Sequence, residues 1–554
     1  MYFMSFPSRS NSWLIPSWPG SRSGKYSTPA RRVSVIDLFA GPGGLGEGFA
    51  SFKDEASQHP FHIDLSVEKE ASAHKTLELR AFLRAFEQGP PKEYYQYLRG
   101  EIDRGELFSL YQPQKAQAIK ETMGGPRTLG DPNSDEIIYK RLRELKGTER
   151  RIVIGGPPCQ AYSVIGRVKN NSLEGYSAEG DDRHFLYVEY LKVLDELEPE
   201  VFVMENVKGI LSSTVSGEPV FPKLKEELSH PTAALKKEGG HRYQIYSLVA
   251  GDGDLFGGKG TDYVIRCEEY GIPQTRHRVI LLGIREDLPS YPGTLDKKES
   301  RTARDVLHDL PALRSGLSKD KDSAENWHKA LLDVAEVVRR EFIELGLDTS
   351  IISESLDKAR EHKSRGSRFV ERAHRRYLGV VPKVLLNWKL ISTKVNNTRD
   401  NELTKWLLDK NLKGFINHES RGHIVKDLAR YLYCSCFANL NEGTTPRVNE
   451  FPEVLAPNHK NWKSKEFADR FKVQASMNPS STITSHIAKD GHYFIHYDPS
   501  QCRSLTVREA ARLQTFPDNY LFEGSRTEQY TQVGNAVPPL LARQIAGIVY
   551  KVLP

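Results

Sequence analysis

Short runs of apolar and β-branched residues recur along the first half of the chain. Each is followed by a glycine-rich or polar turn and then by apolar residues at helical spacing. The runs are Val33–Phe39, Ile152–Ile154, Val201–Met204 and Arg278–Gly283. Strands that alternate with helices in this way are typical of βαβ units. We therefore predict an α/β fold with a parallel, doubly wound sheet.

The same pattern divides the chain into segments. The strand rhythm predicts a first domain over residues 32–285, with a charged, helical insertion at about 88–128. Charged helical stretches dominate residues 286–479 and predict a second, smaller domain, whereas the apolar helical pattern near the end predicts that 480–554 returns to the first domain. Residues 1–31 are rich in Ser, Pro and Arg, a composition that buries little, so we expect them to be mobile.

Composition narrows the class of protein. A chain of 554 residues that is 38% hydrophobic is too long for one ordinary core and has no apolar run long enough to span a membrane. The N-terminus lacks the pattern of a secretion signal, so we expect a cytoplasmic protein. The five cysteines are few and show no zinc-ligand spacing, so we expect neither disulfides nor a metal. A net charge of +6 permits a polyanionic partner without requiring one.

The first motif with chemical meaning follows the first predicted strand. Residues Asp37–Gly46 satisfy G-x-G-x-x-G at Gly41, Gly43 and Gly46, and Glu68 follows the next predicted strand. Glycines let the backbone approach a ligand closely, and an acidic residue at this place can accept from ribose hydroxyls. A dinucleotide site and an adenosylmethionine site both fit, and a plain strand-to-helix turn also fits.

The second motif places a cysteine at the end of a strand. In Gly155-Gly-Pro-Pro-Cys-Gln160, the two prolines stiffen the loop that carries Cys159, directly after Ile152–Ile154. Sheets of this class bind ligands beyond the carboxyl ends of their strands, so a thiolate here is placed to act as a nucleophile. The alternative is a buried, inert thiol, which is the commoner fate of a free cysteine.

Two further motifs supply charges. Glu205-Asn-Val207 ends the run Val201–Met204, and in Gln274-Thr-Arg-His-Arg278 the alternating side chains point to one side of an extended segment. A capping or solvated carboxylate and an ordinary charged edge are the alternatives.

Taken together, these motifs resemble the DNA cytosine-5 methyltransferases, most of which are bacterial modification enzymes. The resemblance spans roughly residues 32–285 and 480–554 and follows the family's order of motifs, ending with the segment from Arg508 to Pro538. It implies a Rossmann-like, S-adenosyl-L-methionine-dependent methyltransferase domain, with a smaller target-recognition domain over 286–479.

The resemblance also implies the site residues. The implied catalytic residues are Cys159, Glu205, Arg276 and Arg278. The implied cofactor-binding residues are Asp37, Phe39, Ala40, Gly41, Gly43, Gly44, Leu45, Glu68, Asp131, Pro157, Leu186, Asn535 and Val537. Among them, Glu68 would bind the ribose, Asp131 the adenine amino group and Leu186 the adenine face.

The chemistry explains why these groups are needed. The resemblance implies that carbon 5 of cytosine would become nucleophilic once Cys159 adds to carbon 6, that Glu205 would be protonated or share a proton with ring nitrogen 3, and that Arg278 would hold the oxygen at carbon 2. A stacked ring cannot be approached from both faces, so the base must leave the duplex. We expect double-stranded DNA as partner, a monomer on DNA, and a restriction endonuclease encoded nearby.

The target sequence cannot be inferred from residues 286–479. Between Glu361 and Arg376 the six basic residues outnumber two acidic ones, and Asn458–Lys465 is a second basic stretch. Each is either a phosphate-binding stretch or a solvated face.

Three rival functions remain from sequence. An RNA cytosine-5 methyltransferase uses the same catalytic residues, although the long recognition region argues against it. A DNA-binding protein that lost catalysis conflicts with the presence of Cys159, Glu205 and Arg278. A dinucleotide-dependent oxidoreductase accounts for the glycines and for none of the later motifs.

Overall fold

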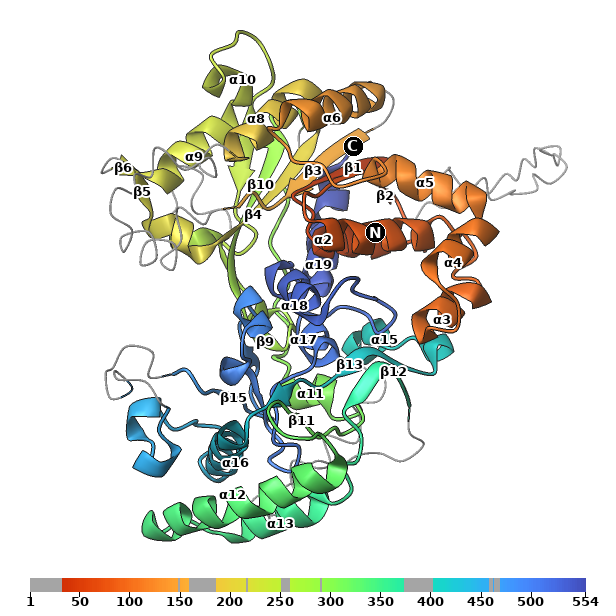
Figure 1. Ribbon diagram of the computed structural model, residues 1–554. Coiled ribbons are helices and arrows are strands. Elements are labelled where there is room, and N and C mark those ends of the chain that lie inside the picture. The colour runs from red at the N-terminus through yellow and green to blue at the C-terminus, as the bar shows by residue number, and fades with distance from the viewer. Residues whose placement is uncertain are drawn as a thin grey trace, which may run out of the picture. The chain divides into compact units, whose positions relative to one another are not determined.

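The apolar runs of the first half form one central sheet (Figure 1). The computed structural model describes residues 32–147, 150–158, 186–215, 218–250, 260–288, 291–372, 402–457, 462 and 469–554. Within these ranges the sheet has seven strands. In order across the sheet they are β2 (Phe61–Val67), β1 (Val33–Leu38), β3 (Arg150–Gly155), β4 (Val201–Val207), β10 (His277–Arg285) and β7 (Tyr243–Tyr246), and β8 (Val264–Arg266) also pairs with β10.

The α/β class is confirmed, but the prediction of a wholly parallel sheet is wrong. Strands β2, β1, β3 and β4 are parallel, whereas β10 runs antiparallel to β4, and β7 and β8 run antiparallel to β10. The reversed strand has a consequence for the site. Because β10 begins at the edge where β4 ends, its first residues lie beside the last residues of β4. A period-two apolar pattern is the same in both directions, so the sequence could not reveal the reversal.

Helices cover both faces of the sheet, as a doubly wound fold requires. Val33 and Val35 of β1 face the core shared with α1 (Gly44–Ser51) and α19 (Pro539–Val552). The alternate residues Ile36 and Leu38 face the opposite core. The helices packed on that second face are α6 (Pro132–Leu145), α8 (Leu186–Leu197) and α9 (Val220–Ser229).

The predicted insertion forms short helices that follow α2 (Ala71–Arg84). They are α3 (Lys92–Arg99), α4 (Arg104–Leu110) and α5 (Gln112–Thr122). Tyr94, Leu98 and Phe108 share a buried cluster with Leu412 and Ile416, which lie far along the chain. The insertion therefore has no separate core and packs against the second half of the protein.

The second half is mainly helical, with small two-stranded sheets. Its principal helices are α11 (Ala303–Leu307), α12 (Ala324–Glu344), α13 (Ser350–Ala359), α15 (Glu402–Leu407), α16 (Val425–Leu440), α17 (Val507–Leu513) and α18 (Arg526–Asn535). The longest of its strand pairs joins β12 (Gly366–Glu371) to β13 (Gly414–Glu419). No described helix has the length and apolar character of a membrane span.

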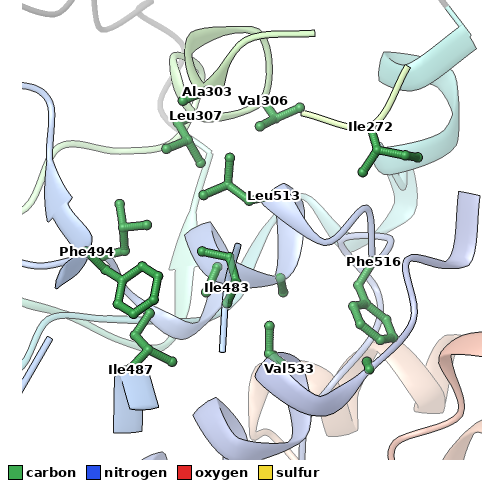
Figure 2. Close-up of a cluster of buried hydrophobic side chains, with 14 of the residues drawn as sticks. Ile272, Ala303, Val306, Leu307, Ile483, Ile487, Phe494, Leu513, Phe516 and Val533 are labelled. Carbon is green, nitrogen blue, oxygen red and sulfur yellow. The ribbon is translucent and has the colours of Figure 1, made fainter. Parts of the chain in front are cut away.

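The C-terminal residues pack among segments from both halves. Figure 2 shows Ile483, Leu513 and Val533 clustered with Ile272 and with Val306 of α11. Residues 32–554 accordingly form one compact unit. The segment from residue 480 therefore contacts the second half as well as α1 of the first half, and its β16 (Ser480–Ser481) pairs with β9 (Gln274–Thr275) in a separate two-stranded sheet.

A group of buried histidines lies beneath this C-terminal segment. His418 contacts Thr506 Oγ1 at 3.0 Å, His362 contacts Ser500 Oγ at 2.9 Å, and His496 Nδ1 accepts from the Asp498 amide at 3.0 Å. Burial lowers the pKa of each of these three histidines to about 4. They are therefore neutral in the folded protein at neutral pH.

We expect the free energy of unfolding to fall as the pH drops from about 6.5 towards 4. In that window the unfolded chain protonates histidines that the folded chain keeps neutral, at a cost of up to about 1.4 kcal/mol per pH unit for each histidine. Urea unfolding at several pH values measures the slope. His362→Gln should reduce this slope by the contribution of one histidine. A free energy of unfolding that stays constant between pH 6.5 and 5 would contradict the low pKa of these histidines.

Candidate active site

The turn after β1 has an unusual backbone. Phe39, Gly41 and Gly43 all have positive φ angles, of 54°, 58° and 95°. A left-handed conformation is strained for phenylalanine, and such strain persists only where neighbouring groups enforce it. We call residues 39–43 the cofactor loop, after the binding that the sequence predicts for them. It leads directly into α1 at the edge where the parallel strands end.

Glu68 helps to enforce this conformation. One of its carboxylate oxygens accepts from the Gly41 amide at 2.8 Å and the other accepts from the Glu70 amide at 2.7 Å. Burial raises the pKa of Glu68, while these amide hydrogen bonds oppose the rise. The Lys69 amide also donates to this carboxylate, which has about four acceptor positions, so Glu68 can still accept from a hydroxyl group of a ligand.

Asp37 lies beneath the loop. Its side chain is buried, and a Cβ atom added at Gly46 would lie 2.8 Å from one carboxylate oxygen. Burial raises the pKa of Asp37 to about 8, against the attraction of Arg84. No side chain or amide of the described residues meets hydrogen-bond geometry with either oxygen. The Asp37 side chain therefore packs under Gly46 of α1.

The segments that carry the two predicted adenine contacts, Asp131 and Leu186, pack against each other. The amide of Arg127 donates to the Glu68 carbonyl at 2.8 Å, and Asp131 caps α6 by accepting from the Ser134 amide at 2.9 Å. Gly130 packs against Glu189 in the first turn of α8, the helix that begins with Leu186. The segment that carries Asp131 thus contacts both the Glu68 backbone and the first turn of α8.

The C-terminal segment packs directly on α1. A Cβ atom added at Gly44 would lie 2.3 Å from the Val537 carbonyl oxygen, and one added at Gly48 would lie 2.3 Å from Ala542 Cβ. Val537 is buried there, as is Leu45, whereas Asn535 is exposed. Glycine is required at position 44 because the backbone after α18 fills the place of a side chain.

Alanine at two of these glycines should have different effects. Gly44→Ala forces Val537 away from α1 and should cost about 1–3 kcal/mol of stability. At Gly41 nothing lies within 4 Å of an added Cβ, so Gly41→Ala should cost about 1–2 kcal/mol through its positive φ and also obstruct ligand binding. Urea unfolding with and without S-adenosylmethionine separates the loss of folding stability from the loss of ligand binding. The ligand should stabilise Gly41→Ala much less than it stabilises the wild type. Equal stabilisation of that variant and the wild type would contradict this.

Glu205 and Arg278 form an ion pair at the same edge of the sheet. Arg278 Nε lies 2.8 Å from Glu205 Oε1, and the two side chains are only 12% and 13% exposed. The antiparallel register of β10 and β4 pairs Arg278 with Val207 and Ile280 with Glu205, which brings the two charges together. A Cβ atom added at Gly156 would lie 2.9 Å from Glu205 Oε2. The loop after β3 therefore passes directly over the carboxylate.

Cys159 itself lies outside the described residues. The residues that lead to it are described: Gly155 pairs with Leu38 and with Met204, and Pro157 is buried. The turns after β1, β3 and β4 thus meet at one edge of the sheet, as the sequence predicted for such motifs.

The remaining members of the Gln274–Arg278 motif bind the C-terminal segment. Gln274 Oε1 accepts from the Ile483 amide at 2.7 Å, and the Arg276 guanidinium donates to the carbonyls of Ile483 and Gly534 at 2.8 and 3.2 Å. Burial and then the nearby Arg278 lower the pKa of Arg276 to about 9. Arg276, predicted as catalytic, is therefore engaged by backbone carbonyls of this segment.

The predicted basic stretch is largely used within the protein. Arg365 pairs with Asp322, Arg368 donates to the Tyr97 carbonyl and stacks over its ring, and Arg372 lies 3.6 Å from Asp518. Lys363 is exposed, whereas Arg375, Arg376 and nearly all of Asn458–Lys465 lie outside the described residues. These internal contacts weaken the argument that Arg365 and Arg368 bind phosphate.

Sequence reasoning missed two contributors to the site. Gly156, which makes room for Glu205, is the second glycine of a motif already recognised. Tyr520, whose hydroxyl donates to the Pro42 carbonyl, has no local pattern that marks it, because the two residues are 478 positions apart.

Comparison with known proteins identifies the family. The model of the C-5 cytosine-specific DNA methylase family matches residues 130–551. The Type II methyltransferase M.Bpa9945I of Bacillus paralicheniformis is 33% identical over 543 residues, which cover 94% of this chain and 99% of the relative. The Type II methyltransferase M.AgeI of Thalassovita gelatinovora is 26% identical, with 93% and 98% covered. The DNA (cytosine-5-)-methyltransferase M.ApeKI of Aeropyrum pernix is 26% identical, with 74% and 83% covered. Since the family model and these alignments span most of the chain, it belongs to the family of C-5 cytosine-specific DNA methylases and is a DNA (cytosine-5-)-methyltransferase.

Proposed function

We propose that the protein methylates carbon 5 of cytosine within a specific duplex DNA sequence, through a covalent adduct of Cys159 with a base rotated out of the helix. The observation that carries the proposal is the buried ion pair of Glu205 and Arg278 beneath the loop that leads to Cys159. A carboxylate and a guanidinium at one sheet edge, with a cysteine directly following the described loop in the sequence, match the needs of an attack on carbon 6 of a pyrimidine.

The chain's own groups divide the reaction between them. The Cys159 thiolate forms a bond to carbon 6, and the electron pair displaced from the double bond makes carbon 5 nucleophilic. Glu205 takes up a proton from solvent as the base enters and holds it at ring nitrogen 3, which offsets the negative charge that builds on the ring. After methylation, solvent water accepts the carbon 5 proton and the electron pair of that bond re-forms the ring double bond. The bond between sulfur and carbon 6 then breaks, its electrons return to the Cys159 thiolate, and ring nitrogen 3 gives its proton back to Glu205.

Arg278 has two tasks in this scheme. Its guanidinium has five donors, and the Glu205 carboxylate and the His277 carbonyl engage only part of them. The remaining N–H groups can donate to the oxygen at carbon 2 of the ring. The pair with Glu205 also fixes the orientation of the carboxylate before the base enters.

The residues of the cofactor loop fit S-adenosylmethionine. Glu68 retains an acceptor position for a ribose hydroxyl, and open space lies beside the left-handed Gly41. When bound, the cofactor supplies a methyl group on a positively charged sulfur. We assign Glu68 to the ribose, Asp131 to the adenine amino group and Leu186 to the adenine face. Contacts of Phe39, Ala40, Gly43, Leu45, Pro157, Asn535 and Val537 complete the proposed site.

Asp37 and Arg276 take supporting places in the proposal. Asp37 is buried under α1, and Arg276 is held by the carbonyls of Ile483 and Gly534. We therefore propose that Asp37 shapes the cofactor loop and that Arg276 fixes the C-terminal segment beside the site, without contact to the base.

The recognition of DNA belongs to residues 286–479 in this proposal, with a monomer bound to the duplex. Two of the relatives are named Type II methyltransferases. We infer that this protein likewise belongs to a restriction–modification system, beside an endonuclease that reads the same sequence.

Transfer of labelled methyl groups tests the function. The full chain is incubated with labelled S-adenosylmethionine and either mixed duplex DNA or structured RNA, and the nucleosides are then separated. We expect label in 5-methylcytosine from DNA. Label only in RNA, or in a base other than cytosine, would overturn the proposal, and bisulfite sequencing of the methylated DNA would report the target sequence.

A further inference from the structure

One buried tyrosine connects the cofactor loop to a distant part of the chain. Tyr520 is fully buried, and its hydroxyl donates to the carbonyl of Pro42, between the left-handed residues Gly41 and Gly43. Burial raises the pKa of Tyr520, so the hydroxyl stays protonated and remains a donor. A Cβ atom added at Gly43 would lie 3.0 Å from the Tyr520 hydroxyl oxygen, so the tyrosine lies directly against the loop.

The tyrosine is itself held firmly. The Arg80 guanidinium lies 4.3 Å above the ring centre and pairs with Glu47 at 2.5 Å. The rings of Phe516 and Phe522 pack at 4.7 and 5.4 Å from that of Tyr520. A hydroxyl with so little freedom can impose its position on the carbonyl that it binds.

The residues around Tyr520 are fastened to the second half of the protein. Asn519 accepts from Arg80 at 3.1 Å and donates to Asp409 at 2.8 Å. Trp406 Nε1 donates to the Thr515 carbonyl at 2.6 Å, and the Asp518 amide donates to the Leu407 carbonyl at 2.8 Å. Segment 515–520 therefore lies between the cofactor loop and the residues at the end of α15.

We propose that Tyr520 is a positioning residue for S-adenosylmethionine, whose hydroxyl holds the Pro42 carbonyl so that the strained cofactor loop keeps its binding geometry. The inference rests on the proposed function of the loop. Strained conformations need external support, and the contact supplies it from a residue that touches neither cofactor nor DNA in this scheme. Tyr520 and its neighbours thus link the cofactor loop to the region that follows α15.

The chain contains a matched control. Tyr530 is also buried, its hydroxyl donates to the Leu505 carbonyl at 2.7 Å, and Arg421 lies 4.5 Å above its ring. Tyr520→Phe and Tyr530→Phe therefore remove the same atom from closely similar surroundings. Only the first removes a contact with the cofactor loop.

The test measures binding of S-adenosylmethionine to the full-length variants by titration calorimetry, alongside kcat and KM with DNA and the midpoint of urea unfolding. Tyr520→Phe should raise the dissociation constant and the KM for S-adenosylmethionine on the order of tenfold, because a buried carbonyl loses its donor. Its kcat should change less than about twofold, and Tyr530→Phe should bind like the wild type despite a similar loss of stability.

Two results would overturn the inference: wild-type affinity in Tyr520→Phe, or equal weakening in both variants. A wild-type protein that binds no S-adenosylmethionine would instead overturn the proposed function. If Tyr520→Phe does not fold, hydrogen exchange of the wild type decides. Added S-adenosylmethionine should then slow exchange in residues 515–521 together with 39–47, but not around Leu505, and unchanged exchange in 515–521 would refute the coupling.

Discussion

Replacement of Cys159 by alanine is expected to lower the rate of methyl transfer to DNA on the order of 10⁴-fold or more, because the ring then has no nucleophile to activate carbon 5. Binding of S-adenosylmethionine should stay within about twofold, since the Glu68 and Gly41 contacts are unchanged. DNA with 5-fluorocytosine at the target gives a second measurement. Fluorine cannot leave as a proton does, so the wild type should remain attached to this DNA through denaturation and Cys159→Ala should not.

Cys267→Ala is the matched control. Burial raises the pKa of Cys267 to about 12, so at neutral pH it is a thiol and a poor nucleophile. It nevertheless lies close enough to Arg276 and Arg278 to feel their charges. We expect Cys267→Ala to keep both methyl transfer and the trapped complex. Substantial transfer by Cys159→Ala would exclude the covalent route.

Glu205→Gln should reduce kcat by about 10² to 10³-fold with little change in the KM for S-adenosylmethionine. The amide keeps the shape of the carboxylate beside Gly156, but it loses the charge that pairs with Arg278 and cannot take up a proton and transfer it to ring nitrogen 3. Steady-state kinetics with a DNA substrate measure both constants. The tyrosine and glycine variants described above should instead change cofactor binding.

Glu68→Gln is the counterpart of this variant. It also replaces a carboxylate by an amide, here at Glu68, one of whose oxygens accepts from the Gly41 amide. We expect it to raise the KM for S-adenosylmethionine more than it lowers kcat. If the two glutamine variants showed the same pattern of constants, the division between a catalytic and a cofactor-binding carboxylate would fail.

The sequence predicted the strands and the edge where the motifs meet. Val33–Phe39 and Val201–Met204 were expected strands, and β1 and β4 cover them to within a few residues. Local apolar patterns determine such elements because each strand must bury alternating residues. The glycine loop and Glu68 could be found for the same reason, since a turn and an acid directly follow their strands.

The pairing of charges across the sheet could not be predicted. That Arg278 meets Glu205 depends on the reversed direction of β10 and on its register with β4, which no local pattern contains. The positions of Asp37 beneath the loop and of Arg276 against Gly534 likewise depend on packing between segments far apart in the chain. The sequence therefore identified which residues form the site more reliably than it identified the role of each residue.

The packing of α19 on α1 also bears on how the protein is made. The cofactor loop leaves the ribosome early, but Tyr520 is added 478 residues after Pro42, and Val537 follows later still. Until then, Gly44 faces no backbone and the Pro42 carbonyl has no donor. A nascent or truncated polypeptide that ends before these residues therefore lacks both supports of the cofactor loop, and we expect full DNA modification to await synthesis of the last helices.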